Sequence, residues 1–436
     1  MKKSNTKRKQ VKGAEERTVV EFFVRHGQCL LPMVELIEQS SLAVDELIDV
    51  VGRNAVEAVL QMSAQQLTGA KSQGKQTNRA NGVRWYGRQW GAVALSDRKL
   101  SVLRPRLRDQ AGEVAIPAYE VMQDDARLGA RMMTSLLSGV STRNYEKLLR
   151  EMADTVGVKK SSVSREFIEE SAGKVQELAE RRFEQQHLLV IYLDGIVFGQ
   201  HHVLCAVGID SAGFKHVLGV KLGASENAVV AKDLLVDLVA HGLDPKVVRL
   251  FVIDGAKALR KAVKEVFGDY AVVQRCRTHK LRNVLAYLPE ELREQTATVI
   301  RGAYKLPYKE GLARLKTQAA WLEKPYPQAA ASLLEGLEET FTVNRLAVPS
   351  SLAKCLATTN IIENPNGTVR RQTRRVSRWQ DGAMVLRWAA SAFLNAEKKF
   401  RRVSGYEQLR LLEATLKACL PDDQQAAQLA LQAKAA

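Results

Sequence analysis

Two aspartates each close a run of apolar residues and stand directly before a glycine. Asp194 ends the apolar part of "LLVIYLDG", and Asp254 ends that of "RLFVIDG". An Asp-Gly pair after a single strand usually makes a turn. Two such pairs in one sheet can instead converge, because open sheets with flanking helices bind ligands near the carboxyl ends of their strands.

Carboxylates that are held close together repel each other unless they share a proton or a cation neutralises them. Mg²⁺ suits such a pair, because it prefers hard oxygen ligands and binds through a few carboxylates together with substrate phosphate. Glu363 in "TTNIIENPNGTVRRQTRR" is the best candidate for a third carboxylate. The pattern predicts a magnesium site that faces phosphates, with a plain turn as the alternative for each aspartate.

The charge of the chain points to the same kind of partner. The 436 residues include 65 Lys and Arg against 48 Asp and Glu, a formal net charge of +17. Such a balance favours nucleic acid as a partner over a merely cationic surface. Five arginines follow Glu363, and those at 370/371 and 374/375 recur at helical spacing. They would line a phosphate-facing side, with a solvated basic face as the alternative: Arg370, Arg371, Arg374, Arg375 and Arg378.

The composition disfavours other classes of protein. No apolar run approaches the ~18 residues that a membrane span needs, and the basic N-terminus lacks the apolar part of a secretory signal. The five cysteines are scattered and odd in number, which fits reduced thiols better than a disulfide framework. We expect a cytoplasmic chain that has no membrane partner and associates with the nucleoid.

The elements that must position the two aspartates lie between His187 and Pro289. Three short apolar runs separated by tight breaks indicate antiparallel strands, and two strand-helix pairs follow them. The order βββαβαβα predicts an α/β fold with a mixed sheet and helices on its faces. Asp194 would then lie on the first strand and Asp254 at the end of the fourth, while Glu363 comes from beyond a purely helical stretch.

Composition and periodicity divide the chain into eight segments. They are a basic disordered arm (1–18), an N-terminal helical region (19–80), a small β-hairpin region (81–120), a helix-turn-helix region (121–183), the first part of the α/β core (184–288), a helical insertion (289–350), the final part of the core with the helix of Glu363 (351–405) and a C-terminal tail (406–436).

The stretch "YEKLLREMADTVGVKKSSVSREF" has the pattern of a helix-turn-helix. Ala153 is small where the helices would cross, Gly157 falls at the turn, and Val163 faces inward. The second helix, about Lys160–Glu170, would present polar side chains to a major groove. The DNA-contacting residues would be Lys160, Ser161, Ser162, Ser164 and Arg165. An ordinary helical hairpin is the alternative, which the glutamates of the second helix favour.

Four stretches, in this order, resemble the IS256/Mutator group of DDE transposases: "LDG" at 193–195, "VIDGAKAL" at 252–259, "QRCRTHKLRNVLAYLP" at 274–289 and "TTNIIENPNGTVRRQTRR" at 358–375. The resemblance covers roughly residues 80 to 405. The 109 residues from Asp254 to Glu363 leave room for the helical insertion of that family. One departure follows Glu363, where the family often has an Arg-Leu-Asn type of stretch and this chain has Asn-Pro-Asn. Pro365 is compatible with a helix at Glu363 only if it lies in the first turn.

The resemblance implies an RNase H-like catalytic core in which Asp194, Asp254 and Glu363 bind Mg²⁺ or Mn²⁺. The reaction would be two-metal-ion phosphoryl transfer on DNA. The protein would bind the terminal inverted repeats of an insertion sequence, cleave DNA strands and join them to target DNA. It would act on double-stranded DNA as a homodimer or a larger assembly. A domesticated DNA-binding protein and an RNase H-like nuclease without strand transfer are the alternatives.

The Cys-x-x-His signature of that family falls on Cys276 and His279. Two ligands without a second pair nearby do not complete a tetrahedral zinc site. We expect Cys276 to pack under the sheet and His279 to lie at the start of a helix beside the acidic cluster. There His279 would act in catalysis, by touching a DNA phosphate or stabilising the leaving group. A structural histidine is equally consistent with the sequence.

Overall fold

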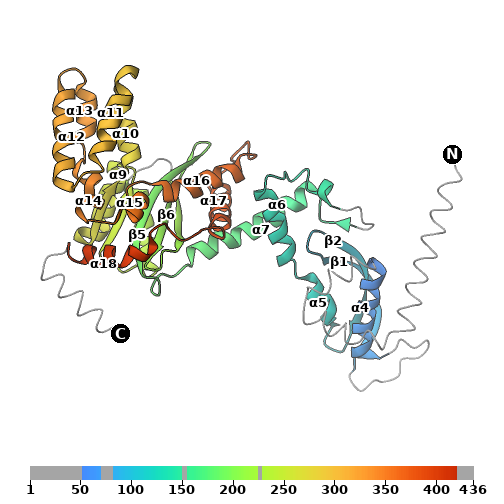
Figure 1. The fold of residues 1–436 in the computed structure, drawn as a ribbon. Helices are drawn as coiled ribbons and strands as arrows, with labels where there is room; N and C mark the ends of the chain where they lie inside the picture. The colour runs from blue at the N-terminus through green and yellow to red at the C-terminus, as the bar shows by residue number, and fades with distance from the viewer. Residues whose placement is uncertain (1–51, 70–81, 150–154, 224–227, 420–436) are drawn as a thin grey trace, which may run out of the picture. The chain divides into compact units, whose positions relative to one another are not determined.

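The computed structural model describes residues 52–69, 82–149, 155–223 and 228–419. These residues belong to two compact units, which divide between residues 170 and 171 and are considered one at a time (Figure 1). The predicted basic arm at 1–18 and most of the predicted tail lie outside the described residues. None of the helices in the described ranges combines the length and the apolar character that crossing a membrane requires.

The N-terminal unit is an antiparallel sheet with helices packed on it. Its elements are α4 (Arg53–Thr68), β1 (Arg84–Ala94), β2 (Lys99–Arg108), β3 (Glu113–Val114), α5 (Pro117–Gln123), α6 (Ala126–Leu137), the 3₁₀ turn η1 (Glu146–Leu148), β4 (Thr155–Val156) and the first part of α7 (Lys160–Ala179). β1 and β2 form a long hairpin, and β2 also pairs with the short strands β3 and β4. Val56 and Leu60 of α4 pack against Leu107 of β2 in the core of this unit.

The helix-turn-helix prediction differs from the structure in the residues before the turn. Glu146–Leu148 form only a 3₁₀ turn, and Thr155–Val156 form strand β4, which pairs with Lys99 and Leu100 of β2. Residues 150–154, which include Ala153, lie outside the described residues. Both residues of β4 are β-branched and fit a pleated pairing better than a helix. The turn itself is present, because Gly157 has a φ of 78° and α7 begins at Lys160.

The C-terminal unit contains a five-stranded mixed sheet in the order β7-β6-β5-β8-β9. Its strands and the helices between them are β5 (Leu188–Phe198), β6 (His201–Asp210), β7 (Lys215–Gly223), α8 (Ala228–Ala240), β8 (Arg249–Ile253), α9 (Lys257–Phe267), η2 (Gly268–Tyr270), β9 (Ala271–Arg275) and α10 (Arg277–Ala286). β5, β6 and β7 pair in antiparallel fashion, whereas β5, β8 and β9 are parallel. The predicted order βββαβαβα is confirmed.

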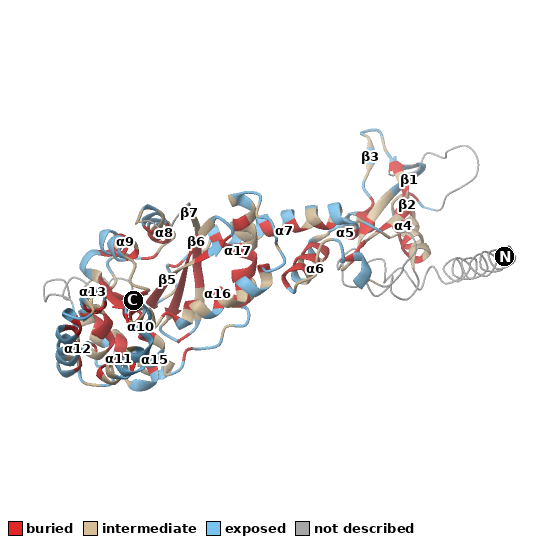
Figure 2. Ribbon diagram, turned by 90° about the horizontal axis from the view of Figure 1, so that it is seen from above, coloured by how far each residue is buried: buried red, intermediate tan, exposed pale blue. Residues whose placement is uncertain are grey.

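Helices cover this sheet, as the buried strands in Figure 2 illustrate. Leu193 of β5, Phe251 of β8 and Leu234 of α8 belong to one apolar cluster, which also takes in the inner side of α9. Side chains alternate across a strand, so Asp194 lies on the face opposite Leu193. A hydrogen bond from α16 to Asp194 places that helix over this second face.

The rest of the chain is helical in the described residues from Glu290 onward. The elements are α11 (Glu290–Ala303), α12 (Tyr308–Glu323), α13 (Pro327–Leu334), η3 (Glu338–Phe341), α14 (Thr342–Arg345), α15 (Ser350–Leu356), α16 (Asn360–Thr373), α17 (Gly382–Glu397), η4 (Tyr406–Gln408) and α18 (Leu409–Lys417). Leu315, Leu333 and Phe341 anchor a separate core beneath α10 to α13. This core stabilises the helical segment between the sheet and the helix of Glu363.

Candidate active site at the carboxyl edge of the sheet

The parallel pairing of three neighbouring strands stops in register at one edge of the sheet, where β8 and β9 end and β5 continues to Phe198. Leu193 of β5 is aligned with Ile253 of β8, and Ile253 is aligned with Arg275 of β9. The residues that follow these aligned positions are Asp194 in β5, Asp254 directly after β8 and Cys276 directly after β9. The N–H of Cys276 donates to the carbonyl oxygen of Ile253 at 2.8 Å, which fixes the last of these positions. The topology thus places both aspartates side by side, although 60 residues separate them in the sequence.

Asp194 is partly buried on β5. Burial raises the pKa of its carboxyl group from 3.8 to about 6, and the negative charge of Asp254 adds to this effect. His279 has the opposite influence, because a positive charge favours the ionised carboxylate. The positive charge of His279 does not offset burial, and a bound cation would supply the remaining countercharge.

Asp254 is held by the turn that it starts. Its Oδ1 accepts a hydrogen bond from the N–H of Ala256 at 2.8 Å. The intervening Gly255 has a φ of 110°, a conformation that residues with a side chain rarely adopt. The turn predicted for an isolated Asp-Gly pair is therefore real, and it aims the carboxylate at the strand edge.

Glu363 reaches the same edge from α16, where it is the fourth residue of the helix. The hydroxyl of Thr359, one turn earlier, donates to Oε1 of Glu363 at 2.5 Å. Pro365 is the sixth helical residue, so the prediction that it must lie in the first turn was wrong. A proline there removes the hydrogen bond to the carbonyl of residue 361 and crowds that carbonyl, but the helix continues to Thr373 because its inner face is buried.

A donor that the sequence did not reveal comes from the next turn of α16. Asn366 is only 1% exposed, and its Nδ2 donates to Oδ2 of Asp194 at 2.7 Å. Its Oδ1 is buried and accepts no hydrogen bond from the described residues. The only hint in the sequence is the spacing of three residues from Glu363, which puts both side chains on one face of a helix.

Cys276 and His279 lie beside Glu363. The ligand atoms of these three side chains all lie within 4.8 Å of one another, and Nδ1 of His279 is 3.8 Å from Oε1 of Glu363. Thr359 connects them, because its hydroxyl lies 3.2 Å from Sγ of Cys276 and 3.3 Å from Nδ1 of His279. Among the described residues no other trio of Cys, His, Asp and Glu is this close.

The charges of this trio are coupled. Contact with Cys276 raises the pKa of His279 to about 9, although burial opposes the rise, and the nearby carboxylates of Glu363 and Asp254 add to it. Burial raises the pKa of the Cys276 thiol, but hydrogen bonds from His279 and Thr359 outweigh it and lower that pKa overall. His279 therefore carries positive charge at neutral pH next to the carboxylates.

The oxygen ligands at this edge suit a hard cation better than Cys276, His279 and Glu363 suit zinc. Asp194, Asp254 and Glu363 offer carboxylate oxygens, and Asn366 offers a buried amide oxygen, which are the ligand types that Mg²⁺ prefers. Sγ of Cys276 already accepts from the N–H of Thr359 and lies 3.2 Å from the hydroxyl of that residue. Cys276 therefore acts as a buried packing and hydrogen-bonding centre under the sheet.

Comparison with known proteins places this site in a family. The model of the family described as "Transposase, Mutator family" matches residues 28–403. The chain belongs to the Mutator family of transposases. It is 30% identical to the transposase for insertion sequence element ISRM5 of Rhizobium meliloti, over 81% of this chain and 88% of that protein.

Two further relatives of this Mutator-family chain come from other bacteria. The transposase for IS256 in transposon Tn4001 of Staphylococcus aureus is 28% identical, over 62% of this chain and 70% of that protein. The transposase for IS1081 of Mycobacterium tuberculosis is 27% identical, over 65% of this chain and 69% of that protein. The resemblance inferred from the four sequence motifs is confirmed.

The predicted DNA-contacting residues of this Mutator-family chain fall into two separate groups. Arg370 and Arg371 lie on the last turn of α16, and the other three follow that helix; all five side chains are exposed. The second group belongs to the first turns of α7 in the N-terminal unit. Lys160, Ser161 and Arg165 are exposed there, whereas Ser162 and Ser164 are partly buried.

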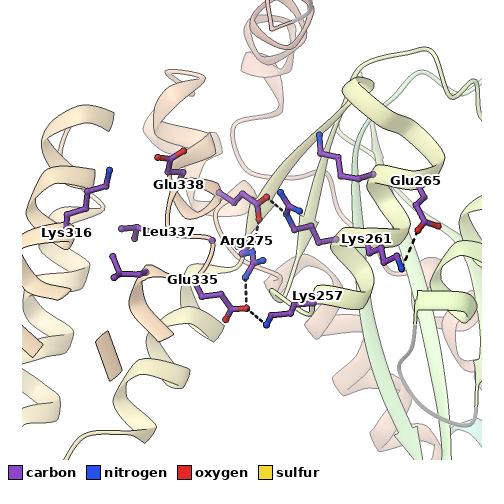
Figure 3. A pocket seen from close by; sticks show the side chains of 13 residues that line it. Lys257, Lys261, Glu265, Arg275, Lys316, Glu335, Leu337 and Glu338 are labelled. Carbon is purple, nitrogen blue, oxygen red and sulfur yellow. Dashed lines mark hydrogen bonds and ion pairs between the residues drawn. The ribbon is translucent and has the colours of Figure 1, made fainter. Parts of the chain in front are cut away.

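A charged groove lies between α9 and the helical segment in the same Mutator-family chain (Figure 3). Nζ of Lys257 lies 3.6 Å from Oε1 of Glu335. Nε of Arg275 lies 2.7 Å from Oε2 of Glu339, whose other oxygen is 2.5 Å from Nε of Arg260. α9 follows Asp254 directly and Arg275 precedes Cys276, so these ion pairs tie the helical segment to both sides of the carboxyl edge.

Proposed function

We propose that this protein is a DNA transposase that binds the terminal inverted repeats of an insertion sequence, cleaves DNA strands and transfers them to target DNA. The position of Asp194 and Asp254 directly after the aligned residues Leu193 and Ile253 carries the proposal. Family membership and the net charge of +17 support DNA as the substrate. The sheet order, with helices on both faces and a third carboxylate on a later helix, supports an RNase H-like core.

In this proposal Asp194, Asp254 and Glu363 hold divalent metal, Mg²⁺ or Mn²⁺. When bound, the metal would polarise the scissile phosphate and activate a water or a DNA 3′-hydroxyl for in-line attack. The chain's own part is to fix the ligands before DNA arrives. Asn366 orients Asp194 through the bond from its Nδ2, and Thr359 orients Glu363. Such fixed geometry matters because a displaced ligand costs much of the rate.

His279 supplies positive charge at the same edge. Its imidazolium, favoured by Cys276 and by the carboxylates, faces Glu363 at 3.8 Å. We assign it the role of stabilising charge on the leaving oxygen or on an adjacent phosphate. The exposed arginines after Glu363 would hold the DNA backbone, and the first turns of α7 would read the element ends. Two ends must be joined, so the active form would be at least a homodimer on DNA.

The test uses DNA that carries the ends of the flanking element, in the presence of Mg²⁺. Asp254→Asn should bind this DNA but neither cleave nor join it, because one metal ligand is weakened. Asp233→Asn is the matched control, since Asp233 is an exposed carboxylate on α8. Full activity of Asp254→Asn would show that the carboxylate assignment is wrong. Cleavage without joining by the wild type would identify a nuclease, and binding without cleavage would identify a DNA-binding protein.

A further inference from the structure

The hairpin of β1 and β2 carries a row of arginines on one face, toward its open end. Arg104, Arg106 and Arg108 alternate along β2 with Pro105 and Leu107, which are buried. The row spans about 14 Å at ~3.4 Å per residue. Because side chains alternate along a strand, Leu100 and Val102 lie on this same side, where they are buried. Arg104 covers the ring of Tyr119 of α5 and closes that core, so the arginines beyond it need a separate explanation.

The far end of the hairpin brings two arginines directly opposite each other. Arg84 of β1 is aligned with Arg108 of β2, and both side chains are exposed. Like charges directly opposite on antiparallel strands destabilise the pair. No described carboxylate forms an ion pair with either residue. The two opposed charges therefore destabilise the free protein. A polyanion bound to the hairpin would neutralise them and remove this destabilisation.

The other charges of this face leave an excess of arginine. Glu113 of β3 forms ion pairs with two of these arginines. Its Oε1 lies 3.3 Å from Nη2 of Arg104, and its Oε2 lies 2.7 Å from Nη2 of Arg106. Glu57 of α4 accepts from the backbone N–H of Leu103 and pairs with a residue of its own helix. The carboxylate of Asp109 accepts from the backbone N–H groups of the turn that follows β2.

Aromatic rings on the hairpin are covered by guanidinium groups. Arg106 and Arg108 lie 5.3 and 5.1 Å from the ring centroid of Tyr86, which is 51% exposed. On the other side of the hairpin, Arg53 of α4 lies 4.8 Å from the ring of Trp90. Proteins that bind single-stranded nucleic acid expose open aromatic faces on which the bases stack. These occupied rings instead stiffen the arginines, whose planar forks suit backbone phosphates.

We propose that the open end of the β1–β2 hairpin, with Arg84, Arg106 and Arg108, is a binding surface for the phosphate backbone of double-stranded DNA. A two-stranded antiparallel ribbon has the width to lie in a major groove. The surface is distinct from α7 and from the arginines that follow Glu363. The inference concerns binding alone, so it stands or falls independently of metal-dependent cleavage.

The experiment measures binding of the full-length protein to a labelled duplex of unrelated sequence, in EDTA and over a range of salt concentrations. Arg84→Gln together with Arg108→Gln should weaken binding about tenfold and make the slope of log K against log salt shallower by about 1.8, because two phosphate contacts are lost. The matched control, Lys309→Gln with Arg314→Gln, removes the same charge from exposed positions of α12 and should bind like the wild type. Arg84→Lys with Arg108→Lys should keep the wild-type slope.

Stability is the second readout. Relief of the opposed charges predicts that the glutamine pair unfolds at the same temperature as the wild type or a higher one. If that pair fails to fold, Arg108→Gln alone should still change the slope by about half as much. An unchanged slope would overturn the proposal, and so would an equal loss in the α12 control. Loss of solubility at unchanged affinity would also overturn it, because the arginines would then only protect the edge strand β1 from self-association.

Discussion

Asn366 donates a hydrogen bond from its Nδ2 to Oδ2 of Asp194 at 2.7 Å, and this bond joins helix α16 to strand β5. The same helix carries Glu363 one turn earlier. The contact therefore sets the distance between the strand-borne and the helix-borne carboxylates. Its two partners are 172 residues apart in the sequence, so it also links the two parts of the core across the helical segment.

Asn366→Ala should weaken Mg²⁺ binding about 10- to 100-fold, the usual effect of losing a group that orients a metal ligand. The measurement is the Mg²⁺ dependence of the unfolding temperature, because a ligand of the folded state stabilises it by mass action. Asn364→Ala is the control, since Asn364 is exposed on the same helix. An Mg²⁺ response of Asn366→Ala equal to that of the wild type would leave Asn366 without a role in ligand positioning.

The sequence predicted the aspartates but not the residues that hold them. Asp194 and Asp254 stand out because each ends an apolar run and precedes a glycine. Both features are visible in a few neighbouring residues of the sequence. Asn366 and Thr359 act through contacts to residues far away in the chain, and polar residues in a basic, proline-containing stretch give no local signal. The two-residue strand β4 was missed for a related reason, because only its pairing with β2 defines it.

The pKa of Asp194 predicts how stability changes with pH in metal-free buffer. Its folded-state pKa of about 6 lies above the ordinary value of 3.8, so the ionised carboxylate disfavours folding. The destabilisation is absent at about pH 4, grows as the pH rises to about 6, and reaches an upper bound of about 3 kcal/mol. In EDTA, Asp194→Asn should therefore raise the unfolding temperature at about pH 7.5 and have little effect at about pH 4.

Asp233→Asn serves again as the control, because an exposed carboxylate has the same exposure to water in both states. Its unfolding temperature should follow that of the wild type at both pH values. An equal rise in unfolding temperature from Asp194→Asn at the two pH values would mean that burial does not destabilise the ionised carboxylate. Saturating Mg²⁺ should remove the advantage of Asp194→Asn at high pH, since the wild type then gains the countercharge.

The arginines after Glu363 should bind DNA without regard to its sequence. Arg370→Gln with Arg374→Gln removes two exposed charges at helical spacing. If each contacts a phosphate, the slope of log K against log salt becomes shallower by about 1.8, and affinity falls equally for element ends and for unrelated duplexes. Anisotropy titrations of both duplexes measure this. A loss confined to element ends would instead indicate that these arginines read bases.

Thr359 is predicted to be a positioning residue for Glu363. Its hydroxyl lies 2.5 Å from Oε1 of Glu363 and also contacts Cys276 and His279. Thr359→Val keeps the shape but removes the hydroxyl, so strand cleavage should fall about 10- to 100-fold while DNA affinity is unchanged. Thr359→Ser should restore most of the activity.

Thr358→Val is the matched control. The hydroxyl of Thr358 is buried without a hydrogen bond in the described structure, so its removal should be neutral or stabilising. Equal loss of cleavage in both valine variants would show that packing, rather than the hydroxyl of Thr359, supports the site.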